Sequence, residues 1–282
     1  MIGDRRWIPE LEGEALLLHR VFLAEKWLVT RLHYGHIDPR EAGVGNVVNC
    51  GATMYVAPIG IANSGAPETA YAEAIDVAGA HQSSYGREAA GVYAAAIARA
   101  MAPGANVNDV IDTTLRLAKD GTREAIDAVV SAASTVTDWR SGLATLRTAV
   151  EPFDTVGPNY RQPARDARIP SRTKAIEELP IGLGMLVAAQ GDYSEAVLGS
   201  INYGRDSDSI AVMAGSIAGA IAGRSAIPQE WISAVSEGSR MDITSTGPVM
   251  ASVARDIWTA DQASMMSRAS AMDGLNASAA AN

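Results

Sequence analysis

Residues 202–209 read Asn-Tyr-Gly-Arg-Asp-Ser-Asp-Ser, and residues 210–223 continue as IAVMAGSIAGAIAG. The first stretch crowds carboxylates and hydroxyls onto a turn, and the second predicts an apolar helix of small residues. Gly215, Gly219 and Gly223 recur at every fourth position, so one face of this helix carries no side chains. Because glycine costs about 1 kcal/mol relative to alanine in a helix, such a face indicates tight packing against neighbours. The stretch therefore predicts a buried core helix that begins at an acidic turn.

The acidic turn has two interpretations. Asp206 and Asp208 are close enough in sequence to repel each other, unless a cation lies between them or both face the positive end of the helix. Asp and Ser are also ordinary N-cap residues, so helix capping is the alternative to a ligand site. Magnesium prefers oxygen ligands, and the turn is anchored to a rigid core element. We therefore expect Asp206, Asp208 and Ser209 to be metal ligands.

The composition favours an all-α protein. Hydrophobic residues make up 48% of the chain and aromatic residues only 5%, while Ala and Gly are abundant, which favours close-packed helices. No long run of Val, Ile, Thr or aromatic residues alternates with period two, so strand signals are scarce. No linker divides the chain into independent cores. We expect one helical domain over residues 1–260, followed by a helix end and a flexible tail over 261–282.

Hydrophobic periodicity and punctuation by Pro and Gly divide the chain into expected helices. Residues 152–172 contain four prolines and predict a long loop, and long loops are often functional. The last ten residues are expected to be disordered. The expected helices cover residues 12–34, 67–79, 81–101, 109–119, 123–135, 174–190, 193–200, 210–223 and a segment that opens at Pro228.

Charge and cysteine content exclude several classes of partner. The net charge is −9 and no basic cluster stands out, which argues against electrostatic binding to nucleic acid. The single cysteine, Cys50, rules out an internal disulfide and suits a reducing compartment. No secretory signal pattern is apparent, and the apolar run at 210–223 is too short to span a bilayer. We therefore expect a soluble cytoplasmic protein that binds no membrane.

Several motifs, in order, resemble those of the ADP-ribosylglycohydrolase family. The acidic turn and its helix resemble the family's C-terminal metal motif, which usually reads Asp-Thr-Asp-Thr where this chain has Asp-Ser-Asp-Ser. Serine keeps the hydroxyl ligand, so this change is mild. The resemblance covers roughly residues 40–235 and also rests on the segments Asn49-Cys50-Gly51-Ala52-Thr53-Met54-Tyr55-Val56-Ala57-Pro58-Ile59-Gly60, Gly79-Ala80-His81-Gln82, Tyr85-Gly86 and Glu177-Glu178-Leu179-Pro180.

The resemblance implies a compact orthogonal helical bundle and an activity. Members of the family hydrolyse N-glycosidic bonds to ribose with two magnesium ions, which orient the ribose hydroxyls and an attacking water. It implies that Asp206 and Asp208 are catalytic, and that these two and Ser209 form one half of the metal centre. It also implies a small-molecule partner that resembles ADP-ribose or a nucleoside. Magnesium is therefore the expected cofactor, with one ion or none also possible in this chain.

Further residues are candidates for binding the substrate. The resemblance implies that the segment around Asn49 and Gly51 lines the cleft, and that His81 and its neighbours contact the ligand. Taken alone, a histidine in an apolar setting is more often structural. Arg205 has two open roles, a structural ion pair or a contact with a ligand phosphate. The expected substrate-binding residues are Asn49, Gly51, His81, Gln82, Tyr85, Gly86 and Arg205.

Other polar residues receive weaker assignments. Nothing near Cys50 in sequence supplies a base, so we expect an inert buried thiol rather than a nucleophile. Glu177 and Glu178 are adjacent and point about 100° apart on a helix, so we do not expect both at one site and favour a solvated face. Polar residues of the Pro-rich loop could add contacts to a ligand, namely Asn159, Tyr160 and Arg161.

The chain departs from the family pattern at its N-terminal side. The family's Gly-Asp-Ala-x-Gly stretch and Thr-Asp-Asp-Thr motif are absent, and Glu10, Glu12 and Glu14 stand around the start of the first expected helix instead. These acids could substitute as ligands or simply enrich a helix N-terminus. A truncated product, a diverged relative and a half completed by another chain all fit the departure. A second subunit could also cover apolar surface left exposed, which makes a homo-oligomer a further expectation.

Three functions follow as hypotheses. The first is magnesium-assisted hydrolysis of an N-glycosidic bond to ribose in an ADP-ribosyl or related nucleotide or nucleoside substrate. The second is a catalytically inactive relative that binds a ligand or has a structural role, which the missing motif favours. The third is a different enzyme that acts on a small glycoside, which only the altered acids at 10–14 favour.

Overall fold

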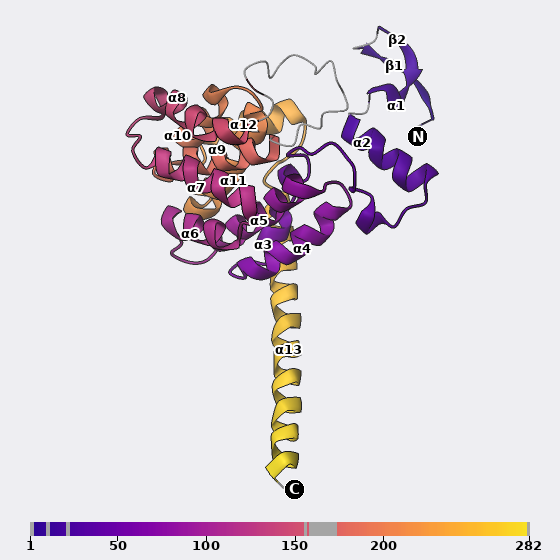
Figure 1. The fold of residues 1–282 in the computed structure, drawn as a ribbon, viewed down its shortest axis with the longest axis vertical. Coiled ribbons are helices and arrows are strands. Elements are labelled where there is room, and N and C mark those ends of the chain that lie inside the picture. The colour runs from indigo at the N-terminus through magenta and orange to yellow at the C-terminus, as the bar shows by residue number, and fades with distance from the viewer. Residues whose placement is uncertain (1–2, 10–11, 21–22, 155–156, 158–173, 281–282) are drawn as a thin grey trace.

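The computed structural model describes residues 3–9, 12–20, 23–154, 157 and 174–280. Figure 1 shows a body of packed helices, a small N-terminal hairpin beside it and one long helix that leaves it. The described elements are β1 (Arg5–Ile8), β2 (Gly13–Leu16), α1 (Leu17–Arg20), α2 (Leu23–Leu28), a π-helical turn (Val29–Tyr34), α3 (Ala57–Ala62), α4 (Pro67–Gly79), α5 (Ser84–Ala100), α6 (Val107–Leu117), α7 (Asp120–Ala133), α8 (Trp139–Val150), α9 (Lys174–Ala188), α10 (Tyr193–Tyr203), α11 (Ser207–Ala222), α12 (Gln229–Ser239) and α13 (Thr246–Ala280). The all-α class expected from the sequence is confirmed.

Helices α5 and α9 form the centre of the body. Helix α5 contacts α3, α4, α6, α9 and α11, and α9 contacts α7, α8, α10 and α11. Alanine and glycine fill much of α5, so neighbouring helices can approach its backbone closely. A Cβ on Gly60 of α3, for example, would lie 2.5 Å from the carbonyl oxygen of Ala94. The small-residue composition thus acts through close helix packing, as the sequence predicted.

Helix α11 packs against α10, α9 and α5. Its glycine face meets α10, because a Cβ on Gly215 would lie 2.9 Å from a methyl group of Val197 and one on Gly219 would contact the ring of Tyr193. Gly223 has another role, since it ends the helix with φ of 77°, a left-handed conformation that glycine adopts readily. The predicted buried core helix is confirmed, and it begins at Ser207 rather than Ile210.

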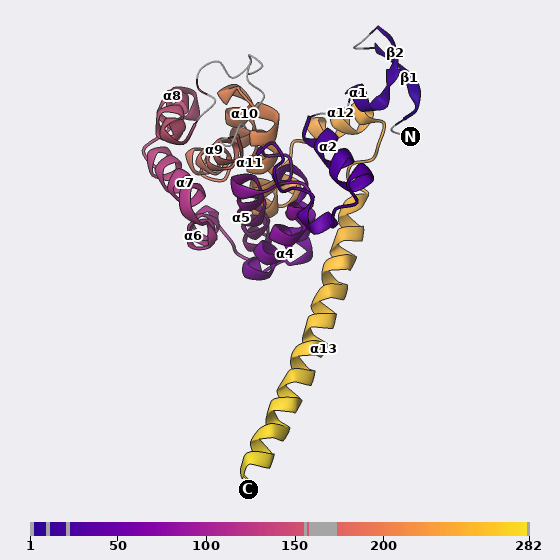
Figure 2. The same cartoon turned by 45° about the vertical axis from the view of Figure 1, so that its right-hand side comes forward.

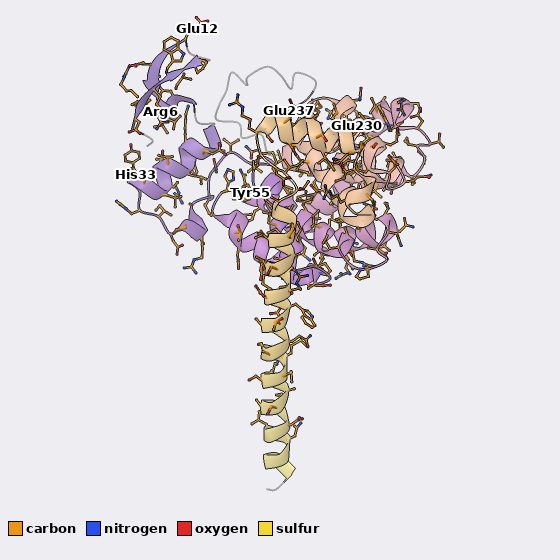
Figure 3. All side chains as sticks on the ribbon, turned by 180° about the vertical axis from the view of Figure 1, so that it is seen from behind. Arg6, Glu12, His33, Tyr55, Glu230 and Glu237 are labelled. Carbon is orange, nitrogen blue, oxygen red and sulfur yellow. The ribbon has the colours of Figure 1, made fainter. Side chains whose placement is uncertain are left out.

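The first expected helix, residues 12–34, is wrong at its start. Residues Gly13–Leu16 pair antiparallel with Arg5–Ile8, and the turn places Glu12 at φ of 46°. Pairing with the preceding strand satisfies backbone groups that a helix would otherwise bond internally, and it overrides the local helical pattern. Figure 3 shows Glu12 at the hairpin, away from Tyr55 in the body. The chain becomes helical from Leu17 onward, in short pieces.

The other expected helices lie close to observed ones. Helix α4 has the expected bounds, while α6 begins two residues earlier than expected because the side chain of Asn106, not Asn108, caps it with Asp109 in a capping box. Helix α8, Trp139–Val150, forms where no helix was expected. The last ten residues, expected to be disordered, belong to α13 as far as Ala280. Most of the expected loop at 152–172 lies outside the described residues.

None of the described helices combines the length and apolarity that crossing a membrane requires.

Candidate functional site

The turn between α10 and α11 has a specific backbone shape. Gly204 and Arg205 both have left-handed φ values, 79° and 55°, and this geometry sends the chain sharply from one helix into the next. Asp206 occupies the N-cap position of α11, yet its carboxylate accepts no capping hydrogen bond from the helix. The capping interpretation therefore does not explain Asp206, and its side chain makes contacts elsewhere.

The carboxylate of Asp206 lies against Cys50 and Glu178. The Cys50 thiol donates a hydrogen bond to Oδ2 of Asp206 at 3.4 Å. One potential ligand atom from each of the three residues lies within 4.8 Å of the other two, and Cys50 and Glu178 are buried. We call these three residues the Cys50–Glu178–Asp206 group. Three chain segments far apart in sequence supply it, namely the loop before α3, helix α9 and the start of α11.

Burial and the nearby carboxylates make Cys50 a neutral thiol. Burial raises the pKa of the Cys50 thiol well above its usual range, and the negative charges of Glu178 and Asp206 raise it further. A thiol is a good nucleophile only as thiolate, so Cys50 without a bound cation is inert. This agrees with the expectation from the sequence.

Asp208 lies apart from Asp206, whereas Ser209 reaches Cys50, and its side-chain hydrogen bond with that thiol opposes the rise in the Cys50 pKa. Asp208 is exposed and lines a shallow groove on the outer side of α11 together with Tyr193 and Ile201. Asp206 is the N-cap residue and turns its carboxylate to Cys50 and Glu178, whereas Asp208 belongs to the helix and is exposed, so the two acids point to different sides. Ser209 is buried, and its hydroxyl donates to the sulfur of Met54 at 3.1 Å. The structure thus brings Asp206 together with Cys50 and Glu178, and not with Asp208.

Five of the expected substrate-binding residues form one connected cluster. The side chain of Asn49 accepts hydrogen bonds from the backbone N–H of Gly51 at 2.8 Å and from Nε2 of Gln82 at 2.9 Å. The Gln82 side chain in turn accepts from the backbone N–H of Asn49 at 3.3 Å. Gly51 and Gly86 permit this contact, since an added Cβ would lie within 3 Å of Asn49 at either position. His81 completes the cluster, because a Cβ on Gly51 would also lie 2.9 Å from its ring.

His81 is held between Tyr55 and Glu25. Its Nδ1 lies 3.2 Å from the hydroxyl of Tyr55, the two rings stack with centroids 5.8 Å apart, and its Nε2 lies 3.1 Å from Oε1 of Glu25. Burial lowers the pKa of His81, while the carboxylate of Glu25 opposes that shift. A neutral ring that accepts from Tyr55 at Nδ1 carries its proton on Nε2, and this buried nitrogen lies near Glu25 without forming a hydrogen bond within the described residues. The cluster thus places the imidazole of His81, from the turn between α4 and α5, beside the loop that carries Cys50.

Tyr85 does not join this cluster. It is half-buried near the start of α7, where a Cβ on Gly121 would lie 3.5 Å from its ring. The residues of the Pro-rich loop that were expected to add contacts lie outside the described residues. They are Asn159, Tyr160 and Arg161.

Arg205 takes part in a buried ion-pair network. Its guanidinium contacts Oε1 of Glu177 at 2.5 Å and Oδ2 of Asp154 at 3.0 Å. Arg147 of α8 pairs with the same two acids, and the hydroxyl of Tyr203 donates to Oε1 of Glu177 at 3.1 Å. Of the two roles left open for Arg205, the described contacts are those of a structural ion pair. The network fastens the acidic turn to α8 and α9.

The expected solvated face for Glu177 and Glu178 is wrong. Their exposed fractions are 1% and 0%, because α9 is enclosed by its neighbours. The angular offset between adjacent helix residues does separate them, since Glu177 joins Arg147 and Arg205 while Glu178 joins Cys50 and Asp206. The sequence carries a signal that could have found them, because two acids followed by the apolar run LPIGLGMLVA indicate buried charges with partners.

The donor atoms of the Cys50–Glu178–Asp206 group fit a divalent cation. Two carboxylates in a partly buried setting repel each other, and a cation between them relieves that repulsion. Carboxylate oxygens suit magnesium, whereas a thiolate suits a softer ion such as zinc. The group therefore fits a divalent metal ion, and its sulfur would favour zinc over magnesium.

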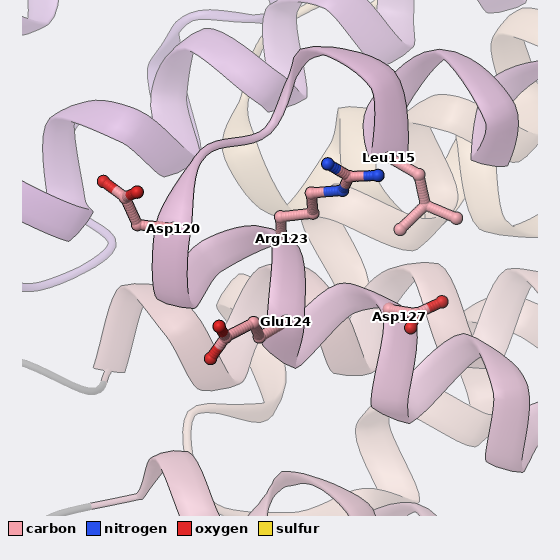
Figure 4. A pocket seen from close by; sticks show the side chains of 5 residues that line it. All are labelled: Leu115, Asp120, Arg123, Glu124 and Asp127. Carbon is pink, nitrogen blue, oxygen red and sulfur yellow. The ribbon is translucent and has the colours of Figure 1, made fainter.

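A pocket at the start of α7 does not belong to this site. Figure 4 shows Asp120, Arg123, Glu124 and Asp127 around it, all on α7, with Leu115 of α6. The four polar side chains are exposed, as expected for the solvated face of an amphipathic helix.

Comparisons with known proteins identify the family of the chain. The family model described as ADP-ribosylglycohydrolase matches residues 5–265, which is nearly the whole chain. No match was found among curated proteins. None was found among solved structures either.

Proposed function

Because the chain belongs to the ADP-ribosylglycohydrolase family, we propose that it hydrolyses an N-glycosidic bond to ribose in an ADP-ribosyl or related nucleotide or nucleoside substrate. The family supports glycohydrolase activity on ADP-ribosyl-type substrates in general. The observation that carries the finer proposal is the position of Asp206, whose carboxylate meets Glu178 and Cys50 beside the Asn49 cluster.

Asp206 and Glu178 are the residues that would hold a divalent cation, with Cys50 as a further donor. Magnesium is the ion that the family resemblance implies, and zinc is the ion that the sulfur favours. Such a cation supplies Lewis acidity and lowers the pKa of a bound water. Asp208 and Ser209 remain proposed ligands from the sequence motif, and their variants belong in the same experiment.

The remaining residues would bind and orient the substrate. The polar cluster around Asn49 and Gln82 fixes the loop that carries Cys50, so the loop presents a rigid wall rather than an adaptable one. Tyr55 is partly exposed and stacks on His81, which gives the wall an aromatic face for a base or a ribose. His81 is oriented by Tyr55, and its Nε2, which forms no hydrogen bond within the described residues, is the ring atom that would exchange a proton with a bound ligand or water.

A binding protein without catalysis is the second candidate function. It is favoured by the outward position of Asp208 and by the hydrogen bond that already occupies the hydroxyl of Ser209. With the carboxylate of Asp208 turned outward, fewer fixed anionic groups remain to hold a pair of metal ions.

Calorimetric titration separates these functions. The protein is titrated with magnesium and, separately, with zinc, and then with ADP-ribose in the presence of each ion. Hydrolysis of an ADP-ribosylated peptide is followed in parallel. Asp206→Asn should abolish metal binding and product release, whereas Asp127→Asn, which changes an exposed acid on α7, should change neither.

Each outcome has a defined meaning. Binding of metal and ligand without product release would support the binding protein. Product release that persists in Asp206→Asn would refute the proposed site. Loss of metal binding in Asp208→Asn as well would mean that both acids of the motif hold the ion, and that the first turn of α11 adjusts on binding.

A further inference from the structure

The C-terminal helix α13 leaves the body of the protein. Only its first turns contact α3, through a side that includes the half-buried residues Met250, Ala254 and Ile257. Figures 1 and 2 show the rest of the helix extending beyond the other elements. Every residue from Trp258 to Asn276 is exposed. Because most helical stability in proteins comes from packing, a helix of this length calls for a partner.

Large apolar side chains form a stripe along this exposed part. Trp258, Met265 and Met272 are seven residues apart, and their exposed fractions are 63%, 67% and 51%. Residues at a seven-residue spacing lie on one side of a helix, which is the arrangement of a two-helix seam. We call these three residues the α13 stripe.

Charged residues flank the stripe in two self-complementary pairs. Asp261 and Arg268 lie about 60–80° to one side of Trp258, and Arg255 and Asp273 lie about 60° to the other side. Within the described part of the chain, none of the four forms an ion pair. Each side of the stripe thus carries one acid and one base, in opposite order along the helix.

When two copies of α13 pair antiparallel along the stripe, residues on one flank of the stripe face residues on the same flank of the other copy. Asp261 then faces Arg268 of the second copy, and Arg255 faces Asp273. In residue number, the midpoint between Asp261 and Arg268 falls at 264–265, and so does the midpoint between Arg255 and Asp273. The midpoint between Trp258 and Met272 falls there as well. One twofold axis therefore satisfies both ion pairs and the apolar seam together. A parallel pair would bring Arg268 near Asp273 but leave Arg255 and Asp261 without an opposite charge.

We propose that α13 is a dimerisation element, and that its partner is α13 of a second copy of this chain in antiparallel orientation. The apolar stripe supplies the attraction, and the flanking charges select the antiparallel register.

Charge reversal in the full chain tests the pairing by analytical ultracentrifugation. The wild type should be a dimer at micromolar concentration. Asp261→Arg and Arg268→Asp should each weaken the dimer about tenfold or more, because each creates two like-charge contacts across the twofold axis. The double variant Asp261→Arg/Arg268→Asp should restore the dimer. Asp256→Arg is the matched control, since it makes the same charge change about 160° from Trp258.

Two results would overturn the proposal. One is a monomeric wild type throughout the micromolar range. The other is a double variant that stays as weak as the single variants, because the proposed partners would then not face each other.

Oxidative cross-linking checks the orientation. The native Cys50 is buried, so new cysteines on α13 report alone. Met265→Cys, near the axis, should link the two copies, whereas Met272→Cys should link only when Trp258→Cys is also present. A strong link from Met272→Cys alone would mean parallel helices and would refute the antiparallel pair.

Discussion

Replacement of Arg205 by methionine should destabilise the protein through the buried carboxylates that it leaves behind. Asp154 and Glu177 have side chains that are 0% and 1% exposed, and both pair with Arg205 and Arg147. Methionine keeps much of the length of the side chain, so packing is largely preserved while the charge is removed. Two buried carboxylates would then share one guanidinium.

The magnitude follows from the burial of the acids. Removal of one partner from a buried ion pair costs about 3–5 kcal/mol, since the remaining charge stays desolvated. Arg147 remains in place and contacts both acids, which moves the expected loss to the lower part of that range. Burial already raises the pKa of Glu177, and the charge of Arg205 opposes that shift, so its removal raises the pKa further.

Urea unfolding followed by circular dichroism measures this loss. Arg116→Met is the matched control, because Arg116 pairs with Glu68 at 2.7 Å between side chains that are 54% and 61% exposed. An exposed pair contributes about 0–1 kcal/mol, so the control should lose little stability. Glu177→Gln should recover part of the loss in Arg205→Met, with a coupling energy of about 1–3 kcal/mol in the double-mutant cycle. Equal losses in Arg205→Met and Arg116→Met, or strict additivity in the cycle, would refute the reasoning.

Three further predictions concern packing, hydrogen bonding and pH. Gly60→Ala should lose about 1–3 kcal/mol, because its Cβ would meet the backbone of α5, whereas Gly238→Ala has open space and should gain a few tenths to about 1 kcal/mol; a reversed order of the urea midpoints would contradict this. Gln82→Ala should lose about 1–3 kcal/mol, because the buried backbone N–H of Asn49 loses its acceptor, and a urea midpoint equal to the wild type would count against it. Burial lowers the pKa of His81, so the unfolded chain takes the proton first as the pH falls. Its stability contribution is therefore present above about pH 6.5 and is lost as the pH falls through the lowered pKa, and His81→Gln should flatten the melting temperature against pH in that window. An unchanged slope in the variant would contradict the assignment.

The elements that local pattern governs could be predicted from the sequence. Helix α4 begins at Pro67 and α11 is apolar and glycine-faced, and both features are written within each segment. The N-terminal hairpin could not be predicted in this way. Residues Gly13–Leu16 carry a helical pattern, and only their pairing with Arg5–Ile8 makes them a strand.

Part of the candidate site could also be predicted, because several of its residues belong to short sequence motifs. Asn49, Gly51, His81, Gln82 and Gly86 come from two neighbouring motifs, and the structure joins them as one cluster. The positions of the candidate metal ligands depended on where α11 begins. Because the helix starts at Ser207, Asp206 stays outside it as the N-cap residue and faces Cys50 and Glu178, whereas Asp208 lies in the first turn and is exposed.

The sequence by itself determined the all-α class and the family, and it singled out Asp206 as a candidate ligand, because helix periodicity and short motifs are local properties. Only the tertiary structure decided the partners of Asp206. Cys50, Glu178 and Asp206 are distant in the chain, and they meet because α9 and α11 pack side by side with the Cys50 loop beside them. The same packing buries Glu177 and places Arg205 in an ion pair with it. Which charges meet in a buried interior depends on how whole helices pack, and no single segment contains that information.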